Sequence, residues 1–183
     1  MTSKDTSPTS HPEVNLVLKS LLPQVVSILG DQFVGMYLYG SLAYGGFDRD
    51  SDVDYIVATR IELTENHFSA LDVMHQRIAG INSWCATQME GSYIPLAALR
   101  TFDPQRVFHL HIDRGKDEHL HRMHIENALL SRAWWGGWVF LRAVLWNSAI
   151  KLAGPDIHTL VDPVEMEELR EAKGQLERRV AER

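Results

Sequence analysis

The feature that most constrains this chain is a short polar segment between two apolar runs. The first run ends at Gly40 and Ser41, and after ten intervening residues Asp52 and Asp54 open the second run. Gly40 allows the backbone to turn sharply and to approach a ligand closely, because glycine has no Cβ. Asp52 and Asp54 stand at i and i+2 of a predicted strand, so their carboxylates point to the same face of the sheet. The segment therefore predicts two strands that flank a glycine turn and paired carboxylates.

This combination suits the binding of a phosphate together with a divalent cation. Backbone amides after Gly40, with the Ser41 hydroxyl, would present donors to a phosphate, especially where a helix begins. Paired carboxylates are hard oxygen ligands of the kind that share Mg²⁺ with nucleotide phosphates. Asp, Ser and Gly are also ordinary turn residues, and an isolated Asp-x-Asp is typical of a polar turn. The fixed order of strand, Gly-Ser, spacer, Asp-x-Asp and strand favours the nucleotide site.

The motif resembles the hallmark of the nucleotidyltransferase superfamily, the polymerase beta-like enzymes, and is most similar to the streptomycin/spectinomycin (aminoglycoside) adenylyltransferases. Those enzymes share a Leu-Tyr-Gly-Ser start, a Gly-Gly pair in the spacer and a closing Ser-Asp-x-Asp, which are residues 38–41, 45–46 and 51–54 here. Residues 152–164 resemble the segment that closes their catalytic domain. The resemblance covers roughly Phe33 to Leu169.

The resemblance implies an α/β fold of nucleotidyltransferase type, with a mixed sheet of about four to five strands and packed helices. It implies a Mg²⁺-dependent transfer of AMP from ATP to a hydroxyl of a small molecule such as an aminoglycoside, and hence antibiotic resistance. Gly40, Ser41 and Ser51 would then hold the triphosphate. Asp52 and Asp54 would bind Mg²⁺.

Glu90 is expected to be the third carboxylate of this site. In the resembled enzymes a carboxylate on the following strand is a metal ligand or takes the acceptor's proton, and Glu90 occupies that place. Alternation within the strand predicted at residues 86–94 puts Gln88, Glu90 and Ser92 on one face. A glutamate inside a strand is costly unless it has partners or a solvated face, so a solvated face is the alternative interpretation.

The strand predicted at residues 106–112 alternates apolar residues with histidines, which indicates one solvated face. Asp113 ends this strand and is the alternative catalytic carboxylate, beside Arg114 and Gly115, which are typical of a turn. Histidines gather in this region: His109, His111, His119, His121 and His124. A structural zinc site is an alternative for them, although no cysteine accompanies them and the Asp-x-Asp pair already offers a harder metal site.

Apolar spacing predicts the helices. These are residues 13–29, interrupted by Pro23, residues 64–79, residues 118–152 with a break at Gly136-Gly137, and a charged C-terminal helix that opens at Asp162. Four apolar side chains recur at helical spacing: Trp134, Trp138, Leu141 and Leu145. This stripe predicts core packing, with a partner surface or an aminoglycoside-facing wall as the alternative.

Bulk properties limit the remaining possibilities. Residues 1–12 are polar and predict a flexible tail, and residues 13–183 are expected to form one nucleotidyltransferase domain. The net charge of −6 argues against a general nucleic-acid surface, and no apolar run is long and uninterrupted enough to predict a membrane span. Cys85 is the single cysteine, which is typical of a reducing compartment and predicts a cytoplasmic protein.

Two rival functions stay open. The resembled adenylyltransferases continue into a helical domain that closes over nucleotide and drug, whereas one helix follows the matching segment here. A homodimer is one way to supply the missing wall. The first rival is a minimal nucleotidyltransferase antitoxin that acts on a partner protein; its spacer usually carries Ala-Arg-Gly, where this chain has Ala43-Tyr44-Gly45. The second is a non-catalytic nucleotide-binding module, against which the intact Asp52, Asp54 and Glu90 argue.

Overall fold

The computed structural model describes residues 7–100, 108–124 and 137–181. Its helices are α1 (Pro12–Leu29), α2 (Ser41–Tyr44), α3 (Glu65–Ala79), α4 (Leu96–Arg100), α6 (Gly137–Ser148) and α7 (Met166–Ala181). Its strands are β1 (Phe33–Leu38), β2 (Val53–Thr59), β3 (Met89–Pro95), β4 (Phe108–Ile112), β5 (His121–His124) and β6 (Ile150–Ala153). The strands form one sheet in the order β5-β4-β3-β2-β1-β6. Strands β2 and β3 are parallel and the other four neighbouring pairs are antiparallel, so the predicted mixed α/β fold is confirmed with one strand more than expected.

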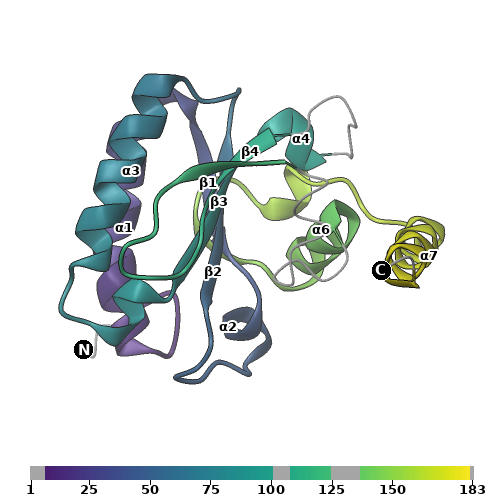
Figure 1. Ribbon diagram of the computed structural model, residues 1–183, viewed down its shortest axis with the longest axis horizontal. Coiled ribbons are helices and arrows are strands. Elements are labelled where there is room, and N and C mark those ends of the chain that lie inside the picture. The colour runs from purple at the N-terminus through teal and green to yellow at the C-terminus, as the bar shows by residue number, and fades with distance from the viewer. Residues whose placement is uncertain (1–6, 101–107, 125–136, 182–183) are drawn as a thin grey trace, which may run out of the picture.

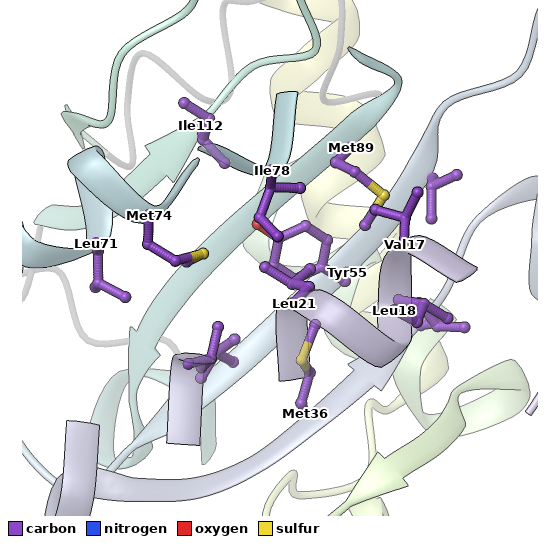
Figure 2. Packing of buried hydrophobic residues seen from close by; sticks show 14 of the residues in the cluster. Val17, Leu18, Leu21, Met36, Tyr55, Leu71, Met74, Ile78, Met89 and Ile112 are labelled. Carbon is purple, nitrogen blue, oxygen red and sulfur yellow. The ribbon is translucent and has the colours of Figure 1, made fainter. Parts of the chain in front are cut away.

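Helices cover both faces of this sheet (Figure 1). Helices α1 and α3 lie on one face, and α6 lies on the other with α4. The larger core forms between the sheet and the α1–α3 pair, where Leu21 of α1 and Met74 of α3 pack against Met36 and Tyr55 of the strands (Figure 2). Complete burial of such side chains contributes about 1.5–3 kcal/mol each, so this layer carries much of the stability.

Helix α1 continues unbroken through Pro23 and is not divided into two helices. Residues Pro12–Gln32 are long and apolar enough to cross a membrane by length and composition alone. In this structure Val14, Val17 and Leu21 are buried in the larger core, as expected for the core helix of a globular domain. The apolar composition of α1 is therefore accounted for by its packing on the sheet.

Alternation along β2 assigns each residue to a layer. Val53, Tyr55 and Val57 belong to the core under α1 and α3, whereas Ile56 and Ala58 belong to the core on the α6 side. Side chains two residues apart share a face, so the acidic residues at the start of β2 face the α6 side of the sheet.

The helix predicted at residues 118–152 is wrong in two described places. Strand β5 pairs with β4, and β6 pairs with β1, at the two edges of the sheet. The periodicity of a short apolar run is compatible with either a helix or a strand. The unpaired backbone groups at the edge of a sheet favour pairing such a run as a strand. Helix α6 is the part of the prediction that holds: Trp138, Leu141 and Leu145 are buried, which confirms core packing, and Trp134 lies outside the described residues.

The solvated face predicted for β4 is also wrong. His109 and His111 are 4% and 1% exposed, because this face of β4 lies on the α6 side of the sheet. The ring centroids of His109 and Trp138 are 5.7 Å apart, so α6 covers the strand here. A histidine-rich strand face reads as polar from the sequence, and only the packing of α6 shows it to be buried.

The predicted start of α3 is confirmed, whereas the predicted start of α7 is wrong. Thr64 caps α3 as predicted, and its side chain accepts a hydrogen bond from the amide of His67. Helix α7 begins at Met166 and not near Asp162. The Asp162 carboxylate instead pairs with Arg100 at 3.1 Å, so a contact with α4 replaces the expected helix cap.

Candidate active site

The predicted site residues meet at one end of the sheet. Strands β1 and β4 end there, and β2 and β3 begin there, as the pairing of the four strands shows. The site segments are therefore the turn after β1 with Gly40 and Ser41, the start of β2 with Asp54, the start of β3 with Glu90, and the loop after β4 with Asp113. Four segments that are far apart in the sequence thus deliver polar groups to one edge.

Asp54 and Glu90 are lateral neighbours in this edge. They are register partners on the parallel strands β2 and β3, so their side chains point to the same face about 5 Å apart along the sheet. Glu90 is 7% exposed, and its strand places it on the α6 side together with Ser92. The structure therefore brings Glu90 beside the Asp-x-Asp pair, and the solvated face that was the alternative for Glu90 is not present.

Burial and mutual repulsion change the acidity of both carboxylates. Burial, followed by the charge of Asp52, raises the pKa of Asp54 to about 7. Burial, followed by the charges of Asp54, Asp52 and Asp113, raises the pKa of Glu90 to about 8. Arg114 opposes both shifts. Carboxylates that share a low-dielectric site in this way are typical of functional sites, because a bound cation relieves their repulsion.

The turn at Gly40 packs directly against Asp54. Gly40 has φ 69° and ψ −151°, a backbone conformation that is essentially restricted to glycine. A Cβ at Gly40 would overlap the carboxylate of Asp54. The amide of Tyr39 donates a 3.1 Å hydrogen bond to the carbonyl of Asp54, which fixes the turn to β2, and Ser41 then begins α2. Gly40 is thus required by the close approach of Asp54 as well as by the turn.

Arg114 contacts the first carboxylate of the Asp-x-Asp pair. Its Nη1 donates to Oδ1 of Asp52 in an ion pair, and to the carbonyl oxygen of Asp50 at 3.3 Å. Sequence reasoning treated Arg114 as a turn residue and missed it. The signal that would have found it is its position: it follows β4, and β4 ends beside the start of β3, where Glu90 lies.

His111 lies between the carboxylates of Glu90 and Asp113. Its Nδ1 is 2.9 Å from the hydroxyl of Ser92, and its Nε2 is 3.8 Å from Oε1 of Glu90 and 3.5 Å from Oδ1 of Asp113. The hydrogen bond from His111 lowers the pKa of Asp113. Asp113, the alternative catalytic carboxylate, is therefore held by His111, with His121 at 3.7 Å on its other oxygen.

Ser51 takes part in a local turn. Its hydroxyl donates to Oδ1 of Asp48 at 2.7 Å and accepts from the amide of Asp48 at 3.1 Å. The hydrogen bond from the Ser51 hydroxyl lowers the pKa of Asp48, and both bonds shape the spacer immediately before Asp52. The hydroxyl of Ser51 therefore stabilises the turn of the spacer.

The donor set of the site fits a hard divalent cation. Within residues 7–100, 108–124 and 137–181, no three His, Cys, Asp or Glu side chains converge as a ready metal site, and the histidine-rich zinc alternative gains no support there. His124 is in β5, and its side chain is outside the description. Asp54 and Glu90 nevertheless supply adjacent carboxylate oxygens, and a bound cation would lower the raised pKa values of both groups. Asp52 pairs with Arg114 instead.

Comparison with known proteins places this architecture. No protein-family model and no curated protein matches the chain. Among solved structures, the spectinomycin adenyltransferase AAD(9) from Enterococcus faecialis, with ATP and spectinomycin, superposes with a TM-score of 0.64 at 14% identity, over 86% of this chain and 63% of that chain. The fold is of nucleotidyltransferase type.

The nucleotidyltransferase-type fold thus confirms the resemblance that the Gly-Ser and Asp-x-Asp motif indicated. The chain spans less than two thirds of the AAD(9) chain. A toxin-antitoxin structure with AMP-PNP aligns over 90% of both chains at 13% identity, with a TM-score of 0.39, which is too low to carry an argument.

Proposed function

We infer that this protein is a Mg²⁺-dependent nucleotidyltransferase that moves AMP from ATP to a hydroxyl of a small molecule. One observation carries this proposal: Asp54 and Glu90 are register partners with raised pKa values, at the edge of a nucleotidyltransferase-type sheet where Gly40 packs against Asp54. Burying two like charges side by side is costly, and binding a divalent cation compensates for that cost.

Each site residue has a role in this proposal. Asp52, Asp54 and Glu90 hold Mg²⁺, which when bound neutralises negative charge on the triphosphate. The turn at Gly40 and Ser41 contacts the triphosphate through backbone amides and the serine hydroxyl. Ser51, proposed from its sequence position as a further phosphate contact, acts through the Asp48 turn that shapes the spacer.

The chemical step is a substitution at the α-phosphorus. The acceptor oxygen forms a bond to the α-phosphorus, the bond from that phosphorus to the oxygen bridging to the β-phosphate breaks, and pyrophosphate leaves. The proton of the acceptor hydroxyl goes to the carboxylate of Glu90. Burial and neighbouring charges raise the pKa of Glu90 to about 8 in the metal-free protein, and a bound cation would keep its carboxylate ionised and able to accept this proton. Nε2 of His111 lies 3.8 Å from Oε1 of Glu90, so the imidazole is the neighbour of this carboxylate on the side of β4.

The acceptor is proposed at the level of a class. The AAD(9) structure contains ATP and spectinomycin, which supports a nucleotide and a hydroxyl-bearing small molecule as the two substrates, with an aminoglycoside as the leading candidate. We also propose that the enzyme is cytoplasmic, as its single cysteine predicts.

A transfer assay tests the proposal. The purified protein is incubated with Mg²⁺ and ATP labelled at the α-phosphate, against spectinomycin, aminoglycosides and a small-molecule cell extract, and labelled products are separated. Asp54→Asn and Glu90→Gln should reduce transfer by about 100-fold or more, the usual contribution of a positioned base. Asp31→Asn is the matched control, since Asp31 is an exposed carboxylate before β1, at the opposite end of the sheet.

Two results would contradict the proposal. Transfer that survives Asp54→Asn unchanged would show that the paired carboxylates are not the site. ATP binding without transfer to any acceptor would instead indicate the non-catalytic nucleotide-binding module.

A further inference from the structure

Arg114 lies against the carboxylates of the candidate site. Its Nη1 pairs with Asp52, and its charge acts on both Asp54 and Glu90, whose pKa values it lowers. The amide of Gly115, the next residue, donates a 2.9 Å hydrogen bond to the carbonyl of Thr87 just before β3. This hydrogen bond anchors the loop after β4 to the sheet at the residue next to Arg114. The anchored loop keeps the guanidinium at the edge of the sheet where the site lies.

The guanidinium retains unused donors. Both of its hydrogen bonds come from Nη1, so Nε and Nη2 have no hydrogen-bond partner among the residues that the structure describes. The side chain is 49% exposed, which leaves those donors open to a ligand. A guanidinium binds two oxygens of a phosphate group through parallel N–H donors, and this geometry is more favourable than a single point contact.

The charge around the site makes such a donor necessary for a triphosphate. Asp52, Asp54, Glu90 and Asp113 all act electrostatically in this region, as the causes of the Glu90 pKa show. A polyanionic ligand entering these carboxylates meets repulsion that its own cation offsets only in part. Arg114 pairs with Asp52 in the free protein. When a cation binds Asp52, the guanidinium can leave this carboxylate and bind the incoming phosphate.

We propose that Arg114 is a triphosphate-positioning residue, which neutralises Asp52 in the free protein and binds the β- or γ-phosphate of the nucleotide when the nucleotide enters with its cation. The inference rests on the proposed function and deepens it, because it assigns the phosphate tail to the loop after β4. Arg114 then orients the leaving pyrophosphate, and Asp52 is released to the cation.

Calorimetric titration along a phosphate series tests this role. Wild-type protein and Arg114→Gln are titrated with Mg²⁺ and AMP-PNP, ADP or AMP. Hydrogen bonds to charged groups contribute about 1.5–3 kcal/mol, so Arg114→Gln should weaken AMP-PNP binding by about tenfold or more. AMP affinity should stay within about twofold, because AMP lacks the β- and γ-phosphates. Arg114→Lys should retain part of the AMP-PNP affinity, since a lysine keeps the charge without the fork.

Arg122→Gln is the matched control. Arg122 is also 49% exposed and also pairs with a carboxylate, that of Glu65, but it lies on β5 at the edge of the sheet. Its removal should leave the affinity for all three nucleotides unchanged.

The outcomes separate this inference from the proposed function. Two results overturn the role of Arg114 and leave the proposed function standing. In the first, Arg114→Gln binds AMP-PNP as tightly as the wild-type protein does. In the second, Arg114→Gln loses the same affinity for AMP-PNP, ADP and AMP. If Arg114→Gln does not fold, as circular dichroism would show, Arg114→Lys gives the same comparison. Absence of nucleotide binding by the wild-type protein overturns both.

Discussion

At the scale of single residues, the candidate site depends on how closely Gly40 approaches Asp54. The glycine has no Cβ where the carboxylate lies, and its φ of 69° with ψ of −151° adds a second reason for glycine at this position. Nearby glycines separate the two reasons. Gly45 has a positive φ with no atom near its Cβ position, and Gly46 has neither constraint.

These three glycines give a graded prediction. Gly40→Ala should destabilise the fold by about 2 kcal/mol or more and abolish transfer, because strain and overlap with Asp54 combine. Gly45→Ala should cost about 1 kcal/mol through backbone strain alone, and Gly46→Ala should be near neutral. Urea unfolding and the transfer assay measure both effects. Full activity in Gly40→Ala would show that the Asp54 contact is dispensable.

Glu90 predicts a pH dependence of stability in the metal-free protein. Its pKa is raised from 4.5 to about 8, so the folded state keeps a proton that the unfolded state has lost between these values. The contribution of Glu90 to stability is therefore present below about pH 4.5 and is lost as the pH rises to about 8. Glu90→Gln should remove this loss and stabilise the metal-free protein by about 4 kcal/mol near pH 8, with less than about 1 kcal/mol near pH 5.

Thermal unfolding of both proteins in a chelator, across this pH range, checks the prediction. A stability difference between wild type and Glu90→Gln that does not change with pH would show that the Glu90 carboxyl titrates normally.

At the scale of elements, α7 is fastened to the domain through a buried arginine of α6. Arg142 is 3% exposed; its Nη1 donates to Oε1 of Glu168 at 2.8 Å, and its Nη2 donates to the carbonyl of Asp162 at 3.2 Å. Helix α7 lies beside α6 at one side of the molecule, away from the sheet (Figure 1). Loss of the Glu168 charge would leave the guanidinium buried without its ion-pair partner.

Glu168→Gln should therefore loosen α7. We expect a loss of about 1–2 kcal/mol, reduced from the value for a fully buried pair because Glu168 is partly exposed. Hydrogen exchange of the α7 amides should accelerate at the same time. The control lies on the same helix: Glu177→Gln breaks the exposed pair with Lys173 and should change stability by less than about 0.5 kcal/mol. Equal effects of the two variants would contradict the anchoring role of Arg142.

At the scale of the whole molecule, the larger core contains a titratable group. His75 of α3 is buried, with its Nε2 2.8 Å from the hydroxyl of Tyr93 and 3.4 Å from that of Tyr55. Burial lowers the pKa of His75 from 6.5 to about 4. The imidazole is therefore neutral in the folded core and must take up a proton more readily when the chain unfolds.

The fold should consequently lose stability on acidification. A depressed histidine pKa contributes stability above the unfolded pKa of 6.5, and this is lost as the pH falls toward 4, to a total of about 3 kcal/mol. His75→Gln should flatten this part of the pH profile. Denaturant unfolding between about pH 7 and pH 4 measures the slopes. A slope unchanged in His75→Gln would contradict the burial of an uncharged imidazole.

The sequence by itself determined the features that depend on local periodicity. The alternation of β2 and β3 set the faces of Asp54 and Glu90, and the Thr64 cap set the start of α3, because each depends only on the residues next to it. Only the tertiary structure decided which segments meet. It made β5 and β6 edge strands, buried His109 under α6, and joined Arg114 to Asp52 across the sheet. Such contacts follow from strand order and helix packing, which no local pattern of residues records.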